Sequence, residues 1–157
     1  MRHTILIAAA LALALALSAA ACTPAAAPPP DAPAPSSTPA EASAARRTWE
    51  SRRPAAYAYT LEISCFCVHR GAYAVEVRDG RITSARDAAT GAPARESQVE
   101  WLLTVDALFE AMRMASSAGT PVRAVFDPAQ GYPTEVEIGM LANDSGTLYR
   151  ITHLRAL

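Results

Sequence analysis

The segment that decides the fold runs from Tyr57 to Cys67 and reads YAYTLEISCFC. Its odd-numbered positions are apolar, and most of its even-numbered positions are not. Because successive side chains of a β-strand point to opposite faces of a sheet, this alternation predicts a half-buried strand. Both Cys65 and Cys67 are expected on the face of that strand that is directed toward the core.

The residues that follow predict a β-hairpin. Segment 73–77 alternates in the same way and leads into Asp79-Gly80, a pair that tolerates the positive φ angles of a two-residue turn. The expected register places Val77 opposite Ile82 on the return strand.

One main helix is predicted over Val105–Ser117, because apolar side chains recur there at helical spacing. Thr104 is the expected N-cap of this helix, and Gly119 together with Pro121 is expected to end it.

Three more strands are expected after the helix. Their alternating segments are residues 122–126, 136–140 and 149–153. In the last of them, Tyr149, Ile151 and His153 are expected on one face. These elements predict an α+β fold, with an antiparallel sheet of five or six strands and the main helix packed on one face.

The size and charge of the chain limit its possible functions. Its 157 residues correspond to about one domain. Its formal net charge is −1 and its pI is near 6.3, whereas a general nucleic-acid binder needs a strongly basic face. No nucleic-acid partner is therefore expected.

Residues 1–21 have the layout of a secretory signal peptide. A short basic head precedes an apolar run from Ile5 to Leu17, which is shorter than the stretch of about 20 residues needed to cross a bilayer. Small residues then lead to Cys22, and this ending resembles a bacterial lipobox, although Ala19 stands where leucine is usual. In a lipobox the cysteine thiol receives a diacylglyceryl group. The alternative is ordinary cleavage after Ala21, which would release a soluble protein.

The lipobox resemblance implies a location as well as an anchor. Several acyl chains on Cys22 would hold the protein at a membrane. Thr23 follows the cysteine, where the inner-membrane retention signal of many lipoproteins has aspartate. The expected location is the bacterial cell envelope, with the domain facing the periplasm and the outer membrane favoured over the inner one.

Three parts of the chain are expected. Residues 1–21 are the signal peptide. Residues 22–45 comprise the lipidated cysteine and a disordered linker that is rich in proline and alanine and has no large apolar side chain. Residues 46–157 form a single α+β domain, which opens with a short helix around Trp49.

If Cys22 is lipidated, Cys65 and Cys67 are the remaining thiols, and three alternatives exist for them. A local disulfide is possible, although a regular strand separates the two Cα atoms by about 6.6 Å, near the upper limit for such a bond. Thiol exchange is the second alternative. The third is a metal site that adds His69, but a straight strand would spread these three ligands over about 13 Å. These three residues are therefore only weak metal candidates.

The sequence contains no Gly-x-Ser-x-Gly elbow, phosphate-binding loop or His-Glu-x-x-His motif. We therefore expect a non-enzymatic binding or structural module without a cofactor. Besides the membrane, its partners would be an envelope protein or a cell-wall ligand, contacted through a sheet face or edge. The alternative is a lipoprotein that handles thiols or metals through Cys65 and Cys67.

Several motifs occur along the domain in a fixed order. They are Trp49 before the first strand, Cys65-Phe66-Cys67, the hairpin Val75–Gly80, Leu108-Phe109 in the helix, and the path from Val125 to Pro133. Their order resembles the bacterial lipoprotein family known as domain of unknown function 6174. The resemblance implies an envelope location and paired cysteines. It implies no reaction, because the family has none assigned, and Gly139 departs from the acidic residues frequent in its late strand.

Overall fold

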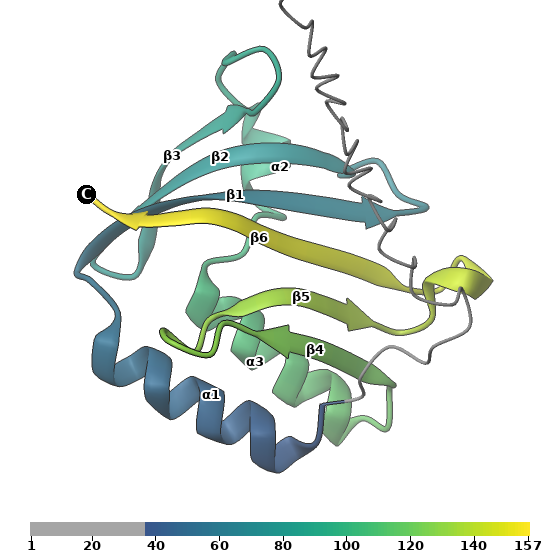
Figure 1. Cartoon of the computed structure of the whole chain (residues 1–157). Helices are drawn as coiled ribbons and strands as arrows, with labels where there is room; N and C mark the ends of the chain where they lie inside the picture. The colour runs from purple at the N-terminus through teal and green to yellow at the C-terminus, as the bar shows by residue number, and fades with distance from the viewer. Residues whose placement is uncertain (1–36) are drawn as a thin grey trace, which may run out of the picture. The chain divides into compact units, whose positions relative to one another are not determined.

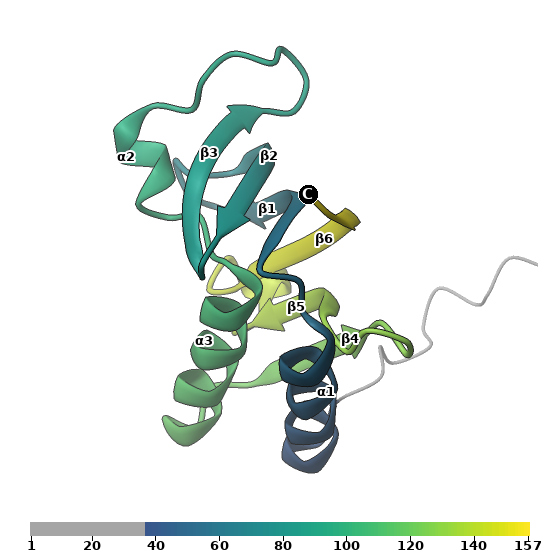
Figure 2. The ribbon, with the colours of Figure 1, turned by 90° about the vertical axis from the view of Figure 1, so that its left-hand side faces the viewer.

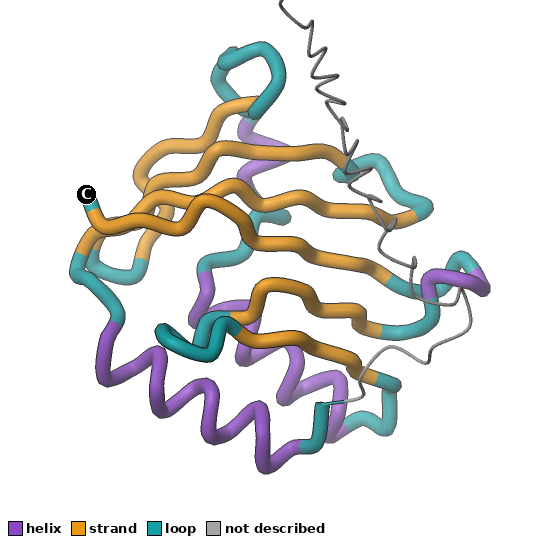
Figure 3. Tube along the Cα trace, in the orientation of Figure 1, coloured by secondary structure: helices purple, strands orange, loops and turns teal. Residues whose placement is uncertain are grey.

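The computed structural model describes residues 37–157, which form one six-stranded antiparallel sheet and the helices packed on it (Figures 1 and 3). The strand order across the sheet is β3-β2-β1-β6-β5-β4. The strands are β1 (Ala56–Cys65), β2 (Gly71–Arg78), β3 (Arg81–Asp87), β4 (Val122–Phe126), β5 (Pro133–Ile138) and β6 (Thr147–Ala156). The predicted α+β class and number of strands are confirmed.

The two long helices lie side by side and run in opposite directions (Figure 2). The helices are α1 (Pro39–Arg52), the short α2 (Glu96–Val99), α3 (Val105–Ser117) and the 3₁₀ turn η1 (Leu141–Asn143). An ion pair of 2.7 Å joins Arg53, just after α1, to Asp106 in the first turn of α3. Arg46 of α1 approaches Glu110 of α3 at 3.8 Å. These contacts set the end of α1 against the start of α3.

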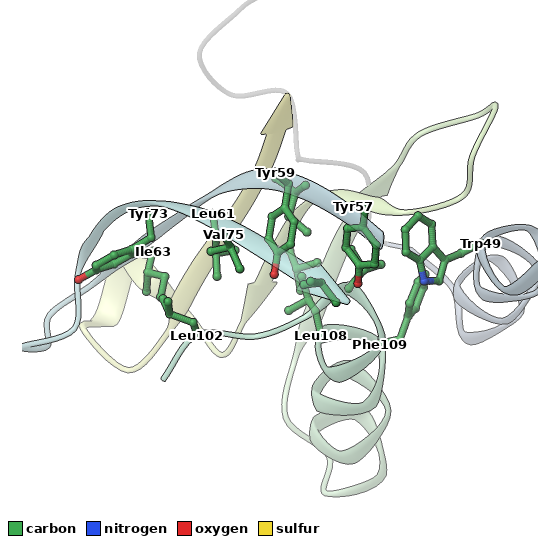
Figure 4. Close-up of a cluster of buried hydrophobic side chains, with 14 of the residues drawn as sticks. Trp49, Tyr57, Tyr59, Leu61, Ile63, Tyr73, Val75, Leu102, Leu108 and Phe109 are labelled. Carbon is green, nitrogen blue, oxygen red and sulfur yellow. The ribbon is translucent and has the colours of Figure 1, made fainter. Parts of the chain in front are cut away.

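The core lies between the sheet and the helices. Tyr57, Tyr59, Leu61 and Ile63 of β1 are all buried, as their alternation predicts. Figure 4 shows the rings of Tyr57 and Tyr59 on the side of β1 that faces Leu108 of α3. Burying such a continuous row of large side chains holds α3 against the sheet.

Helix α1 contributes one fully buried residue to the core, and its Ala42 and Ala45 pack against the core at partial burial. Trp49 is fully buried. Its ring meets those of Tyr57 and Tyr132 edge to face, with ring centroids 5.3 and 6.2 Å away. Edge-to-face contacts of this kind are favourable beyond the apolar area that they bury. The predicted helix around Trp49 is therefore part of the domain.

Two local predictions are confirmed in detail. Helix α3 has the predicted bounds, and the Thr104 hydroxyl oxygen accepts a hydrogen bond of 3.1 Å from the Ala107 backbone N–H. In the β2–β3 hairpin, Val77 pairs with Ile82. Both features depend on side chains within a few residues of each other.

The predicted domain boundary at residue 46 is wrong, because α1 begins at Pro39. A capping box starts this helix: the Glu41 backbone N–H donates to the Thr38 hydroxyl at 3.2 Å, and the Thr38 N–H donates to the Glu41 carboxylate at 2.7 Å. The alanines that follow are strong helix formers, so this part of the predicted linker is helical. The predicted signal peptide, Cys22 and the linker up to residue 36 lie outside the described residues.

The prediction for the inner face of β6 is wrong at His153. Tyr149 and Ile151 lie toward the core, as expected. A β-bulge opposite residues 58–60 then adds one residue to β6, and His153 adopts a φ of 56° there. The bulge breaks the alternation, so His153 is exposed and Leu154 packs against the core instead.

Candidate functional site

One end of the sheet carries a group of exposed apolar side chains. The last rung of the sheet pairs Cys65 with Thr147, Thr147 with Ile138, and Ile138 with Val122. Three loops extend beyond this rung: residues 66–70, 118–121 and 139–146. They connect β1 to β2, α3 to β4, and β5 to β6, so segments far apart in the sequence lie at the same end of the sheet (Figure 1).

Four large apolar side chains are exposed at this end. Phe66 and Val68 have 82% and 88% of their surface exposed, and both lie in the β1–β2 loop. Met140 in the β5–β6 loop is 41% exposed. Trp101 is 54% exposed and belongs to the group because its ring stacks on that of His69, with centroids 4.0 Å apart. We call the surface formed by Phe66, Val68, Trp101 and Met140 the apolar end.

A disulfide closes the loop that presents Phe66. Strand β1 ends at Cys65 and the chain bends, which brings the Cα atoms of Cys65 and Cys67 to 5.2 Å. This separation is shorter than that of a straight strand and allows the bond between them. The expectation that Cys67 continues on the core face of β1 is wrong, because this residue lies beyond the strand end. The bond restricts the backbone on both sides of Phe66.

Helix α2 and the residues after it contact the β1–β2 loop. The side-chain amide of Gln98 donates a hydrogen bond of 3.2 Å to the Tyr73 hydroxyl. That hydroxyl in turn approaches the His69 carbonyl oxygen at 3.5 Å. Trp101 follows α2 directly and stacks on His69. The β1–β2 loop is therefore tied to the segment between α2 and α3 by contacts that the sequence pattern did not predict.

The weak metal candidates do not form a metal site. The sulfur atoms of Cys65 and Cys67 are bonded to each other, and the His69 ring lies against Trp101. Over residues 37–157, no group of three His, Cys, Asp or Glu side chains is placed to hold a metal ion. The Cys65–Cys67 pair is thus a disulfide in this structure, which is the first of the three alternatives.

The apolar end has few charges. The loops 66–70, 118–121 and 139–146 contain only Arg70 and Asp144 as charged residues, and Glu100 stands next to Trp101. The face of the sheet opposite the helices differs, because charged side chains pair across its strands. Arg150 of β6 lies 3.0 Å from Glu135, and Arg123 lies 3.1 Å from Glu137.

The described chain begins beside the apolar end. A groove of about 600 Å³ lies between the start of α1 and the end of α3. Its lining includes Ser37 and Pro39 together with Gly119, Thr120 and Val122. Val122 belongs to the last rung of the sheet, so the start of the described chain and the apolar end lie at the same end of the sheet.

The perturbed titratable groups of the described region have structural causes. Burial raises the pKa of Tyr57 to about 12, and the charge of Asp106 acts in the same direction. A hydrogen bond from Arg113 lowers the pKa of the Glu110 carboxyl, and hydrogen bonds from Thr90 lower that of Asp87. Over residues 37–157, no charged residue is buried. Tyr57 lines a small cavity beside Asp79, whereas Glu110 and Asp87 line neither that cavity nor the groove between α1 and α3, so the perturbed groups are not gathered in one pocket.

The predicted site residues are only partly brought together. Cys65 and Cys67 join, His69 lies near them in the same loop, and Cys22 lies outside the described residues. Phe66, Val68, Trp101 and Met140 were not predicted as functional residues. A signal was available for Phe66 and Val68, because apolar residues at even positions break the alternation of the segment that starts at Tyr57. Nothing local to Trp101 or Met140 indicates that they lie at the same end of the sheet.

None of the helices in the described part of the chain is both long enough and apolar enough to span a bilayer. The family model described as "Family of unknown function (DUF6174)" matches residues 41–156. No curated protein and no solved structure matches the chain significantly. Because the match spans nearly all of α1, the sheet and α3, the chain belongs to the DUF6174 family of unknown function.

Proposed function

We propose that the protein is a lipid-anchored lipoprotein of the bacterial envelope whose domain is a non-enzymatic binding module, and that the apolar end is its contact surface. The observation that carries this proposal is the exposure of Phe66 and Val68, at 82% and 88%, on a loop closed by a disulfide. Exposed apolar groups that gather on an otherwise polar surface mark interaction sites.

The geometry favours binding because the contact residues are held in place before contact. The Cys65–Cys67 bond restricts the backbone around Phe66, and the Trp101 ring is fixed against His69. Side chains that are ordered in advance lose less conformational entropy on association, so more of the apolar burial contributes to affinity. Burial of one Phe or Val side chain is worth about 1.5–3 kcal/mol.

Catalysis is less well supported than binding. The ionisable residues that line the groove between α1 and α3 are Arg46 and Arg113. Arg46 pairs with Glu50 at 2.8 Å, and Arg113 pairs with Glu110 at 2.5 Å. An active site usually combines a pocket with titratable groups that are perturbed and free to react. We therefore propose that the domain has no enzymatic activity.

The anchor proposal rests on the sequence before the domain. Residues 1–21 have the layout of a signal peptide and end at Cys22, as in a lipobox. Acylation there would hold the domain at the envelope membrane, and Thr23 after the cysteine favours the outer membrane. The chain between Cys22 and Pro39 would be the tether, with a reach of at most about 60 Å when fully extended.

The anchor is tested by the intact mass and the fractionation of the protein from cells that export it. We expect a mass increase from acyl chains and recovery with the outer membrane. Cys22→Ala should remove both. A mass that corresponds to cleavage after Ala21, without acyl groups, would contradict the anchor.

The contact surface is tested by photo-cross-linking in the same cells. A photoreactive phenylalanine analogue in place of Phe66 should form adducts. The same analogue in place of Leu157, which is 48% exposed and pairs with Ala56 at the other end of the sheet, is the matched control. Equal adduct formation at both positions would contradict a contact surface at the apolar end.

Thiol–disulfide exchange is a second candidate, because the Cys65–Cys67 bond closes a very small ring in a surface loop. Small-ring disulfides are expected to be more easily reduced than ordinary structural bonds. Equilibration of the protein with glutathione buffers, followed by alkylation and mass measurement, tests this candidate. Reduction only below about −300 mV would identify a purely structural bond.

A further inference from the structure

We propose that the apolar end rests in the interfacial layer of the bilayer that holds the anchor on Cys22, with Phe66 and Val68 inserted between lipid headgroups and Trp101 at headgroup depth. This inference rests on the proposed function, because it requires the lipid anchor, and it adds the partner class. The partner is a phospholipid surface.

The first argument is the direction in which the apolar end faces. Ser37 and Pro39, at the start of the described chain, line a groove together with Thr120 and Val122 at the last rung of the sheet. The anchored segment therefore joins the domain on the side that carries the apolar end. A tether that joins the domain on this side can bring the apolar end to the membrane without passing around the domain.

The opposite end of the sheet differs in chemistry. There the turn at Asp79 and Gly80 joins β2 to β3, and Arg53, Arg78 and Arg81 lie next to it. The apolar end has one arginine and one aspartate in its three loops and one glutamate, Glu100, next to Trp101. A surface with so few charges loses little hydration when it enters the interface of a bilayer, whereas the charged end would lose much more.

The second argument is the kind of side chains that are exposed. Tryptophan and other aromatic residues are enriched at the level of lipid headgroups, where a ring can be half apolar and half hydrated. Trp101 is 54% exposed, and its ring stacks on that of His69. It therefore lies beside the β1–β2 loop that carries Phe66 and Val68. Arg70 follows in the same loop and can reach headgroup phosphates.

The third argument is shape. Phe66 and Val68 project singly from the β1–β2 loop. Neither residue lines the groove between α1 and α3 or the cavity beside Asp79. Met140 follows β5, which lies two strands from β1, a spacing of about 10 Å across the sheet. A convex set of separate apolar tips suits a surface that deforms around each of them. A protein partner would need a pocket for each tip.

Two tryptophans with different exposure provide the measurement. The full chain is purified in detergent from the membranes of cells that export it, and then reconstituted in vesicles of phosphatidylethanolamine and phosphatidylglycerol with nitroxide-labelled headgroups. Trp101 is the exposed reporter and Trp49 is the fully buried reference. We expect the nitroxide lipids to quench Trp101, and the vesicles to protect it from aqueous acrylamide several-fold relative to detergent. Trp101→Phe, which leaves only Trp49, should abolish both effects.

Matched double variants locate the contact. Phe66→Ser with Val68→Ser should reduce the lipid quenching of Trp101 several-fold and restore its access to acrylamide. Val125→Ser with Leu157→Ser removes two exposed apolar groups away from the apolar end and should leave both readings unchanged. Near-ultraviolet circular dichroism of each variant establishes that its fold is retained.

The outcomes separate this inference from the proposed function. An acylated protein that stays on the vesicles while Trp101 remains open to acrylamide overturns the bilayer contact and leaves the anchor intact. Adducts from position 66 that contain protein and no lipid would also overturn it, because the partner would then be a protein. A chain without acyl groups that leaves the vesicles contradicts the anchor and the inference together.

Discussion

Gly131, in the turn between β4 and β5, lies directly against the backbone of α1 at Trp49. A Cβ atom at position 131 would be 2.9 Å from the Trp49 backbone nitrogen and 2.8 Å from the Thr48 Cβ, and closer still to the Ala45 carbonyl oxygen. Gly131 also has a φ of +79°. Close approach and backbone conformation both require glycine here, and the contact fixes how α1 meets the sheet.

Gly131→Ala should therefore destabilise the domain by about 3 kcal/mol, as the sum of left-handed strain and a backbone clash. Gly91→Ala is the control, because Gly91 has a similar φ of +72° but open space around it. It should cost about 1–2 kcal/mol, from strain alone. Urea denaturation of both variants measures the difference, and equal losses would show that the contact with α1 contributes nothing.

The start of α1 should contribute measurably to stability. A chain that begins at residue 46 lacks the capping box of Thr38 and Glu41, and also Ala42 and Ala45, which pack against the core. Relative to a chain that begins at residue 37, it should lose about 2 kcal/mol, roughly half of it from the cap. Equal urea midpoints for the two chains would restore the boundary predicted from the sequence.

The contribution of the buried Tyr57 should make stability fall at high pH. Burial raises the pKa of Tyr57 to about 12, above the value of about 10 in an unfolded chain. Its contribution is fully present below pH 10. It is lost as the pH rises from 10 toward 12, because the unfolded chain releases the phenolic proton first, at a cost of up to about 1.4 kcal/mol per pH unit. Tyr57→Phe should reduce this slope in urea unfolding measured at pH 9, 10 and 11, and part of the slope should remain because burial also raises the pKa of Tyr59.

The same variant should cost little at pH 7. Within the described residues, the Tyr57 hydroxyl is buried and makes no hydrogen bond of regular geometry, although the Val105 backbone lies near it, so phenylalanine removes a poorly paired polar group. Tyr59→Phe is the contrast, because the Tyr59 hydroxyl donates to the Leu103 carbonyl oxygen at 2.5 Å. Its loss should cost about 1 kcal/mol. A larger loss for Tyr57→Phe than for Tyr59→Phe would contradict this account.

Removal of the disulfide should leave the fold intact. Cys65→Ser with Cys67→Ser opens a loop with a sequence separation of only 2, so the entropic stabilisation lost is at most about 2 kcal/mol. The apolar end should bind less well, because the backbone around Phe66 is no longer restricted. The measurements are the urea midpoint and the lipid quenching of Trp101. Unchanged quenching in a folded variant would show that the bond does not organise the contact surface.

The sequence predicts those parts of the fold that depend on neighbours along the chain. Thr104 caps α3 from three residues away, and Asp79-Gly80 turns the hairpin that sets Val77 opposite Ile82. The start of α1 was also readable, because Thr38 and Glu41 have capping-box spacing. It was missed because the composition of the surrounding segment is typical of a linker.

Other features depend on contacts between distant segments and could not be read from local patterns. His153 leaves the core face because β6 must accommodate an extra residue opposite β1, which only the pairing of these two strands creates. Trp101 reaches the β1–β2 loop because α2 is held against the sheet by the hydrogen bond from Gln98 to Tyr73. The candidate site was therefore predicted at Cys65 and Cys67, and its apolar side chains became recognisable only in three dimensions.

The strand order has a consequence for how the molecule forms. Residues 56–87 form a three-stranded meander and residues 122–138 form a hairpin, and each has an edge exposed until β6 enters between β1 and β5. Strand β6 follows the other five strands of the described chain, so the two halves of the sheet cannot join before β6 is available. The centre of the sheet is thus the last part to be completed, and unfinished chains present two open strand edges of the kind that associate with other chains.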